Sequence, residues 1–375
     1  SFAHNNGVLK LTANSAQTVR FSGSDAYATT FSGTGGSWSF LDASATSTNN
    51  VRFEAGTSTL PSGTFAVGGS WTATNGGFSA NGGTVKFVAT STAKTVSPNI
   101  SLFANVIFDG AGGGWTISAS TTATGALSLT TATAFTVSPS VTLAVGGTFT
   151  NAVGGAATTW ATSTLSLYSG TRYSMNTKTT GGDVYGTLSI GAGTNIRSWN
   201  STAATTTVNA TGSLYSQDNA ALSGTPVDGD LYIWGAFTSS ANEYWSYATD
   251  FDGTALGVAS RQVNVRIATS STISYSTGTL QIVGSSTATT TIQNQGNGRY
   301  AFNITGGTLN AQYYSIKNTG TSGLNISGTP TITSLANGDF ELGVNGGTTM
   351  TVASTVIDQN PALQIQQVKF ATSTG

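Results

Sequence analysis

The sequence has no cysteine and very little charge. Of its 375 residues, 13 are Lys or Arg and 14 are Asp or Glu, so 7% are charged, compared with roughly 25% in an average soluble domain. The absence of cysteine excludes a disulfide framework, a thiolate metal site and a cysteine nucleophile. A net charge of -1 without a basic cluster argues against nucleic acid as a partner, because such binding needs many Lys and Arg side chains at the phosphates.

Histidine and long apolar segments are also scarce. His4 is the only histidine, and a Ser-His-Asp mechanism would have to use it, so we do not expect that chemistry. No apolar run approaches the roughly 18 residues of a membrane-spanning helix, and we expect no transmembrane segment. Low charge can indicate disorder, but 7 Trp, 12 Tyr and 17 Phe with regular Val, Ile and Leu spacing predict a packed core.

Small and hydroxyl-bearing side chains are abundant, with 67 Thr, 47 Ser and 48 Gly. An uncharged surface with few lysines offers little to trypsin-like proteases, so this composition predicts an extracellular or cell-surface protein. The first residues, Ser1 to His4, carry no charged-then-apolar signal segment. We therefore expect a mature or excised product.

A long internal repeat organises the first half of the chain. The pattern Phe-x-Gly-x-Gly-Gly-x-Trp at residues 31–38 returns at 108–115. A second pattern, Val-Gly-Gly-x-Trp/Phe-Thr, occurs at 67–72 and again at 145–150. Both motifs thus recur at nearly the same shift, about 77–78 residues, and self-similarity at a fixed spacing indicates a repeated unit rather than chance.

A shorter period appears in the second half. Alternating segments begin at Leu280, Phe302 and Leu324, which are evenly spaced, and a second pair begins at Ile292 and Ile316 with nearly the same spacing. A unit of about 20–25 residues with short strands is typical of one coil of a β-solenoid. The long repeat would then correspond to three or four coils.

The secondary-structure signals are those of an all-β protein. Segments such as 84–88, 126–129 and 279–282 alternate apolar with small polar residues, and Gly-Gly, Asn-Gly or Ser-Gly pairs separate such segments. Leu, Glu, Lys and Arg are too few to favour helices. We predict a right-handed parallel β-helix with coils of about 20–25 residues. Tandem β-sandwiches are the alternative, but they would show modules of about 100 residues.

The repeats also resemble a known group of proteins. Residues 108–151 follow the pattern Phe-x-Gly-x-Gly-Gly-x-Trp-x-Ile, Leu-x-Leu, Leu-x-Val-Gly-Gly-x-Phe-Thr-Asn. This pattern and the run 298–310 resemble bacterial secreted right-handed β-helix surface proteins with filamentous-haemagglutinin-like or autotransporter-passenger-like repeats. The resemblance lies in repeat texture over most of the chain, and it implies this fold and a surface location. Nothing matches the secretion-recognition domain or membrane barrel of those families.

The repeat pattern predicts three regions. Solenoid repeats cover 1–215 and 256–375, and an aromatic and acidic insertion covers 216–255. Five of the 14 acidic residues fall between positions 228 and 252 of this insertion. Such a concentration is the place where the sequence predicts recognition, because loops on a rigid scaffold commonly carry it.

The acids of the insertion have two interpretations. They could provide oxygen ligands for Ca²⁺, because Asp-x-Asp spacing can place two carboxylates on one side of a turn. They could instead belong to a solvated loop that interrupts the solenoid, and catalytic carboxylates are a third option. The sequence contains no EF-hand pattern or calcium-binding nonapeptide. The candidate calcium ligands are Asp228, Asp230, Asp250 and Asp252.

The same stretch is rich in aromatic residues, which also have two interpretations. Exposed Trp and Tyr side chains form sugar-stacking platforms or anchors of a protein interface, and of these we favour a subunit contact. Alternatively the rings seal the core where the coil changes its cross-section. The candidate interface residues are Tyr232, Trp234, Phe237, Tyr244, Trp245, Tyr247 and Phe251.

Stacked coils place equivalent side chains in ladders, which penalise like charges and tolerate Thr, Ser and Asn. The motif at 86–92 is echoed at 369–374, so we see no capping segment there, and uncapped β edges invite pairing with another chain. We therefore expect a structural protein without enzymatic activity or a required cofactor. It would self-assemble into a cell-surface filament or layer. The alternatives are an adhesin that binds a glycan or a protein through residues 228–252, and a polysaccharide-degrading β-helix enzyme.

Overall fold

A computed structural model describes residues 4–160, 162–169, 172–174, 184–191, 194–197, 202–208, 213–214, 229–233, 235–239, 241–249, 255 and 262–371. It is all-β with about 2% helix, and its parallel sheets stack as a right-handed β-solenoid of about 13 turns. This confirms the predicted fold. Tandem β-sandwiches do not apply, because their sheets are antiparallel. Unit 1 comprises Ser1–Ser169 and Met175–Gly186, and unit 2 comprises Gly170–Ser174 and Thr187–Gly375.

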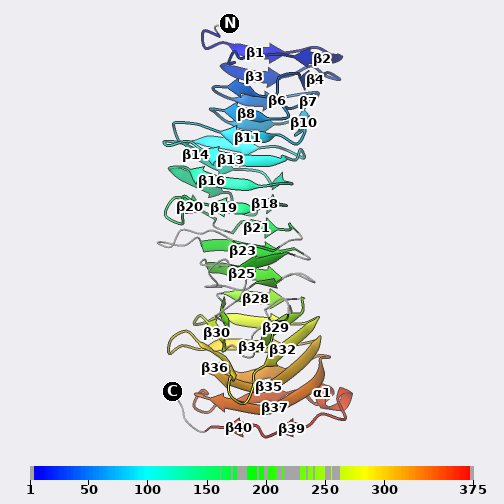
Figure 1. Ribbon diagram of the computed structural model, residues 1–375, viewed down its shortest axis with the longest axis vertical. Coiled ribbons are helices and arrows are strands. Elements are labelled where there is room, and N and C mark those ends of the chain that lie inside the picture. The colour runs from blue at the N-terminus through cyan, green and yellow to red at the C-terminus, as the bar shows by residue number, and fades with distance from the viewer. Residues whose placement is uncertain are drawn as a thin grey trace. The chain divides into compact units, whose positions relative to one another are not determined.

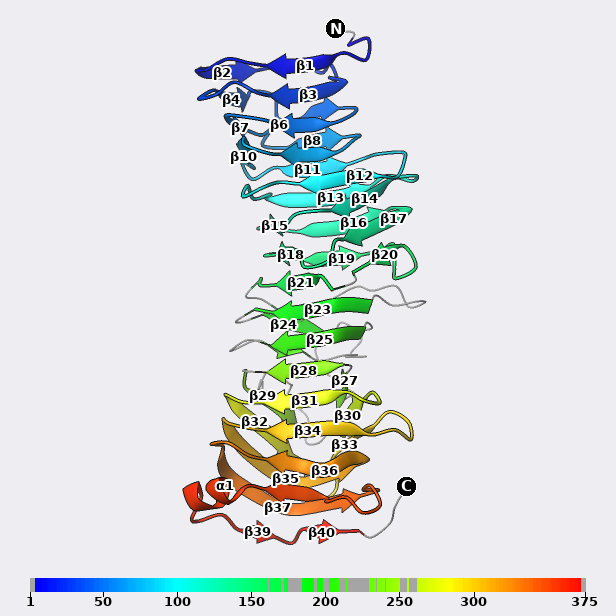
Figure 2. The same cartoon turned by 180° about the vertical axis from the view of Figure 1, so that it is seen from behind.

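In each unit the strands lie in successive layers (Figures 1 and 2). Unit 1 visits three sheets in turn, which we call its first, second and third faces. The first face contains β1 (Val8–Leu11), β3 (Ala28–Phe31), β6 (Val51–Phe53), β9 (Trp71–Ala73), β12 (Lys94–Ser97), β14 (Gly114–Ile117), β17 (Ala134–Val137) and β20 (Thr158–Thr159). The second begins with β2 (Ala16–Val19), β4 (Ser37–Phe40), β7 (Thr57–Thr59) and β10 (Gly77–Ser79).

The second face then changes its pairing pattern. A single parallel bridge joins Phe103 to Ala123, after which the face continues as β15 (Thr121–Ala123), β18 (Thr142–Val145) and β21 (Thr164–Leu167). The third face contains β5 (Ala45–Ser47), β8 (Thr64–Val67), β11 (Thr84–Phe87), β13 (Asn105–Asp109), β16 (Leu127–Thr131) and β19 (Phe149–Asn151).

The register between strands gives the length of each turn. On the third face Val85 lies beside Phe65 of the preceding turn and Val106 of the next. On the first face Phe31 lies beside Phe53 of the next turn. The difference between the residue numbers of two partners is the length of one turn. These lengths lie near the lower end of the predicted range of about 20–25 residues.

The long internal repeat marks corners of the coil. Its first motif leads from β3 on the first face to β4 on the second, whereas its copy leads from β13 on the third face to β14 on the first. The second motif leads from the third face to the first (β8 to β9), and its copy from the second to the third (β18 to β19). The long repeat therefore spans three complete turns and two further faces. As a result, the two copies of each motif lie at different corners of the coil.

Glycines at this corner make room for the tryptophan that follows. A Cβ atom at Gly113 would lie 2.3 Å from Cη2 of Trp115 and 2.5 Å from the carbonyl oxygen of Ala89. At the equivalent Gly36 a Cβ atom would lie 2.8 Å from Cη2 of Trp38. Both indoles are 1% exposed. The pattern Gly-Gly-x-Trp thus lets a large ring fold back over its own turn and enter the core.

Aromatic rings stack along the core from one turn to the next. Phe31 and Phe53 are register partners, and their ring centroids lie 4.9 Å apart with an interplanar angle of 7°. Phe87 and Phe108 repeat this arrangement at 4.8 Å and 11°. All four side chains are buried, and such pairs contribute about 0.5–1.5 kcal/mol beyond the burial of their area.

Two ion pairs join charged side chains on neighbouring turns. Nζ of Lys86 lies 2.8 Å from Oδ2 of Asp109, and Nζ of Lys317 lies 3.1 Å from Oε2 of Glu341. The hydrogen bond from Lys86 lowers the pKa of Asp109 below its usual value. Opposite charges on neighbouring turns avoid the repulsion that a ladder of like charges would produce.

The hydrogen bonds between turns have a direction. Inward-facing Val51 donates its N–H to the carbonyl oxygen of Ser70 on the next turn at 2.9 Å. Outward-facing Ser118 donates its N–H to the carbonyl oxygen of Val96 on the preceding turn at 3.0 Å. Because successive backbone groups of a strand point to opposite sides, inward residues bond toward the next turn and outward residues toward the preceding one.

Unit 2 is built from strands of two large sheets and one small one. The first large sheet contains β25 (Thr202–Val208), β28 (Ala236–Ser239), β31 (Thr272–Tyr275), β34 (Tyr300–Ile304), β36 (Thr319–Ile326) and β38 (Met350–Val352). The second contains β27 (Gly229–Ile233), β29 (Glu243–Ser246), β30 (Val263–Ile267), β32 (Thr279–Val283), β33 (Thr290–Asn294), β35 (Thr308–Lys317), β37 (Thr331–Glu341), β39 (Ile365–Gln366) and β40 (Lys369–Phe370). The small sheet contains β22 (Arg172–Ser174), β24 (Asn195–Arg197) and β26 (Ser213–Leu214).

Two further elements complete the description. The division between the units falls within β23 (Val184–Ile190), and the short helix α1 (Ser354–Gln359) follows β38.

Some turns of unit 2 are longer than those of unit 1. Ala236 has Thr272 as its partner on the next turn, whereas Phe302 has the much nearer Leu324. The longest turns thus overlap the predicted insertion at 216–255.

We predict that Gly113→Ala destabilises the protein by about 1–3 kcal/mol, because the new methyl group overpacks the corner against Trp115 and Ala89. Gly296→Ala is the control, since a Cβ atom there would meet only Oδ1 of Asn294, at 3.8 Å. Urea unfolding followed by tryptophan fluorescence measures both. Equal midpoints for the two variants would show that the corner does not depend on glycine.

Candidate functional site

The described part of the predicted aromatic and acidic segment contains β27, β28 and β29 of unit 2. Gly235 has a φ of +68° and separates β27 from β28. Its N–H donates to Oγ of Ser271 at 2.9 Å. On β28, Phe237 lies beside Ile273, and on β29, Trp245 lies beside Ile282. These register partners face inward, so both aromatic residues occupy inward positions.

The predicted calcium site is only partly covered by the structure. Asp228, Asp250 and Asp252 lie outside the described residues, and Asp230 is described by its backbone alone, beside Asn264. Within the described part of the chain, no group of three or more His, Asp or Glu residues could hold a metal ion. The calcium site at these four aspartates stays a prediction.

The described aromatic residues of the segment divide into buried and partly exposed ones. Phe237 and Trp245 are each 1% exposed, and the ring of Trp245 lies 6.1 Å from that of Phe302. Tyr244 and Tyr247 are partly exposed. Core packing, one of the two predicted roles, describes Phe237 and Trp245, while an interface role for the segment stays a prediction. Trp234 and Phe251 lie outside the described residues, and Tyr232 is described by its backbone alone.

A buried carboxyl group on β29 is the chemically unusual feature of this segment. Glu243 is 0% exposed and lies beside Leu280 in the register. Its Oε1 accepts a hydrogen bond from Oγ of Ser239 at 2.8 Å, and its Oε2 makes no hydrogen bond to the described residues. Burial raises the pKa of Glu243 to about 8. The side chain is therefore mainly protonated and uncharged at pH 7.

The surroundings of Glu243 hold it in place. Oγ of Ser239 also accepts the N–H of Ala241 at 3.2 Å, which fixes the turn between β28 and β29. The hydroxyl of Tyr275 donates to the carbonyl oxygen of Ala241, and burial raises the pKa of this tyrosine above its usual value. Neutral hydroxyl and carboxyl groups thus form a small polar cluster inside the core.

This cluster has a structural rather than a catalytic character. A general acid must reach a substrate proton, directly or through one water, and a side chain with no exposed surface cannot do so. The sequence did contain a signal for it. Glu243 and Trp245 are two positions apart on a short alternating segment, so their side chains point to the same side of the strand. If Trp245 faces inward, Glu243 must face inward too. The many acids of this stretch instead favour a solvated loop, in which Glu243 would be exposed.

A separate shallow hollow of about 600 Å³ lies on the second face of unit 1. Phe78 and Phe103 line it with ring centroids 4.9 Å apart, and Ile100 and Leu102 at its rim are 88% and 50% exposed. Oγ of Ser101 accepts the N–H of Phe78 at 2.9 Å. No ionisable side chain lines the hollow, so it provides apolar contact and no acid or base.

Comparisons with known proteins return nothing: no protein-family model, curated protein or solved structure matches the chain. The described residues include no helix that is long and apolar enough to cross a membrane. The fold and the chemistry of the described residues are therefore the basis for any functional proposal.

We predict that the stability of the protein falls between pH 4.5 and about 8 because of Glu243. In this range the unfolded chain releases the proton while the folded protein retains it, so unfolding becomes easier as pH rises, by up to about 1.4 kcal/mol per pH unit. Below pH 4.5 both states hold the proton and the contribution is complete. Glu243→Gln keeps a neutral hydrogen-bonding group and should remove this part of the pH dependence.

Urea midpoints measured from pH 4.5 to 9 compare the variant with the wild type. Asp358→Asn is the matched control, because it removes an exposed carboxyl group on α1 and should leave the pH dependence parallel to that of the wild type. Parallel curves for Glu243→Gln as well would contradict the assignment of the buried proton to Glu243.

Proposed function

We propose that the protein is an extracellular structural subunit that assembles with copies of itself into a surface filament or layer. The composition supports the location, since a low-charge chain rich in Thr and Ser without cysteine offers little to trypsin-like proteases. The regular uncharged ladders support a mechanical role, because each turn is held by hydrogen bonds and stacked side chains of its neighbours.

Exposed apolar side chains on a low-charge surface are the observation that carries this proposal. Large apolar side chains in contact with water favour association between subunits.

These exposed side chains occur in both units. Ile100 is 88% and Val8 59% exposed in unit 1, and Ile357 is 53% and Phe370 47% exposed in unit 2. Covering them in a contact between subunits would add the hydrophobic contribution of their area.

An adhesin is the second candidate, supported by the partly exposed Tyr244 and Tyr247 in the longest turn of unit 2. Replacing both tyrosines by Ala should abolish binding on a glycan panel if this candidate is right, while assembly stays intact. Unchanged glycan binding, or no binding by the wild type, would reject these tyrosines as the adhesive surface.

We predict that the purified chain forms filaments or sheets in a concentration-dependent manner, because contacts between copies are intermolecular. Negative-stain electron microscopy and sedimentation velocity over a hundredfold range of concentration measure this. Monomers that persist at the highest concentration would contradict the proposal.

A further inference from the structure

We infer that the hollow on the second face of unit 1 is a contact surface between two copies of the chain, related by a two-fold axis. This inference rests on the proposed self-assembly and names the surface, its occupant and its symmetry. Three observations carry it: the outward position of Ile100 and Leu102, the hydrogen bonds that hold their segment, and the lack of charge on the described strands of this face.

The segment that carries Ile100 and Leu102 has a second copy in the sequence. Thr-Val-Ser-Pro occurs at 95–98 and again at 136–139, and each copy leads from the first face to the second. The apolar residues that follow are Ile100 and Leu102 in the first copy and Val141 and Leu143 in the second. The pair in the second copy is 9% and 0% exposed, whereas the pair in the first copy is 88% and 50% exposed. The same sequence at equivalent corners therefore buries one pair and exposes the other.

A difference of one residue in the turn accounts for this exposure. In the second copy, Val141 donates its N–H to the carbonyl oxygen of Ser138 at 3.1 Å. In the first copy, Ser101 donates its N–H to the carbonyl oxygen of Pro98 at 3.1 Å, so the turn closes one position later in the motif. Because side chains of a strand alternate, a shift of one residue moves each of them to the opposite side. The core position passes to Phe103, which is 0% exposed, and the two aliphatic side chains of the segment point outward.

Large apolar side chains differ from their neighbours at these outward positions. The bridge made by Phe103 places Leu102 beside Thr122 of the next turn. The same position on the two turns after that holds Ala144 and Ser166. This column therefore continues with small side chains, and the aliphatic pair instead forms an apolar patch at the hollow. An exposed apolar patch is typical of a surface that contacts another protein.

The exposed segment is held by hydrogen bonds to the preceding turn. Asn99 has a φ of +55°, and its Nδ2 donates to the carbonyl oxygen of Thr74 at 3.3 Å. Oγ of Ser101 accepts the N–H of Phe78 at 2.9 Å, so Ile100 is fixed by the residues on both sides of it. A contact through a segment that is already ordered loses less conformational entropy on binding. Ile100 is therefore prepared for a contact before the partner arrives.

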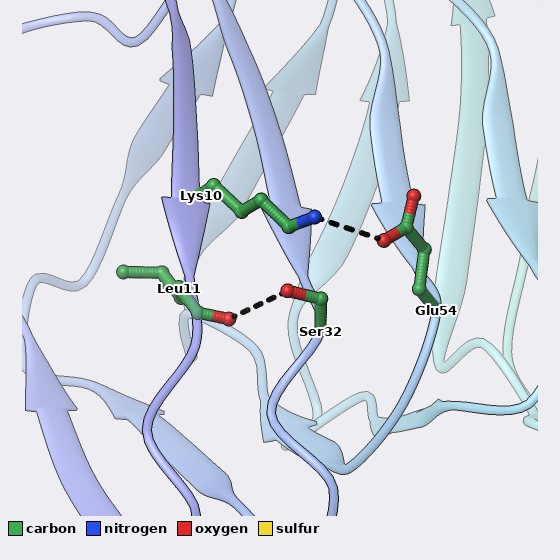
Figure 3. Close-up of polar contacts among 4 residues, drawn as sticks. All are labelled: Lys10, Leu11, Ser32 and Glu54. Carbon is green, nitrogen blue, oxygen red and sulfur yellow. Dashed lines mark hydrogen bonds and ion pairs between the residues drawn. The ribbon is translucent and has the colours of Figure 1, made fainter.

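Charge determines which partner this surface can accept. The described strands of the second face, β2, β4, β7, β10, β15, β18 and β21, contain no Lys, Arg, Asp or Glu, and no ionisable side chain lines the hollow. The first face differs, since Figure 3 shows Lys10 of β1 extending toward Glu54, which follows β6, with Nζ 3.7 Å from Oε2. A charged partner would lose its hydration at the hollow without meeting an opposite charge. The partner must therefore present a neutral, apolar surface.

The chain itself offers such a surface. Ile100 projects at the rim of the hollow, whose lining includes Phe78, Leu102 and Phe103. A two-fold axis places Ile100 of each copy in the hollow of the other, where it contacts this apolar lining. Both projections and both hollows are then occupied at once, and the contact buries no charge. Because both copies use the same surface, the contact is isologous.

An isologous contact limits what this surface can build. It is complete once two copies have met, so the pair is the smallest assembled species. Growth of a filament or layer then requires a further contact elsewhere on the chain.

Ile100→Asp tests the surface. It should raise the dissociation constant of the pair by about a hundredfold or more, because each copy would bring a carboxylate into a hollow without an opposite charge. Ile357→Asp is the matched control, since Ile357 is also exposed but lies on α1 of unit 2, and this variant should pair like the wild type. Sedimentation velocity over a range of concentrations measures pairing, and unchanged circular dichroism and urea midpoints verify that each variant is folded.

A mixture of two variants tests the symmetry. Ile100 lines its own hollow and enters that of the partner, so the two side chains at position 100 lie close together in the pair. Ile100→Asp and Ile100→Lys should each stay monomeric alone at concentrations at which the wild type pairs. Their equimolar mixture should form dimers, because opposite charges then meet across the axis. These mixed dimers should weaken at high salt, which screens the attraction.

The outcomes separate this inference from the proposed function. If Ile100→Asp pairs at the wild-type concentration, the surface is wrong, and self-assembly through another surface remains. If the mixture stays monomeric, the two-fold arrangement is overturned. Wild-type dimers that never grow further would support the inference and reject the filament or layer. A wild-type chain that stays monomeric would reject both.

Discussion

The spacing between successive turns is the constraint on which the rest of this structure depends. Parallel strands lie about 4.7–4.9 Å apart, so each side chain has its counterparts on the neighbouring turns in contact with it. Aromatic rings on neighbouring turns stack on one another, as Phe31 does on Phe53. Amides on neighbouring turns form hydrogen bonds, as Nδ2 of Asn325 does to Oδ1 of Asn303 at 3.1 Å. Charged side chains avoid repulsion by pairing with an opposite charge, as Lys86 does with Asp109, or by lying between neutral residues, as Arg52 does between Thr30 and Thr72. A content of 7% charged residues fits a fold in which surface positions are repeated at this distance.

The same constraint acts at the corners, where a glycine makes room for close contact between successive turns. Some corners, such as the one between β17 and β18, contain no glycine, whereas glycines such as Gly36 and Gly113 serve corners that join different pairs of faces. This explains why the corner motif moves from the first face to the third between its two copies. The repeating element of unit 1 is one face with its corner, and three such elements make one turn, as from Val85 to Val106.

The sequence predicts the features that recur on every turn, and it does not predict those that occur only once. Alternation with period two and the recurrence of like residues gave the all-β class and the coil length, because both are properties of every turn. The turn from Ala236 to Thr272 is longer than most others, and an interruption of the periodicity marks such a turn without giving its length. Aromatic content alone could not separate buried Trp245 from partly exposed Tyr244. Glu243 was overlooked for a related reason: composition places a carboxylate at the surface, and only the register beside Leu280 places this one in the core.

Direction is the property that distinguishes this solenoid from an antiparallel fold. Every turn offers the backbone groups of its inward residues to the turn after it and those of its outward residues to the turn before it. The two sides of a turn are therefore different, and each side pairs only with the opposite side of a neighbouring turn. This is a consequence of parallel pairing, in which successive backbone groups of one strand bond alternately to the two neighbouring strands.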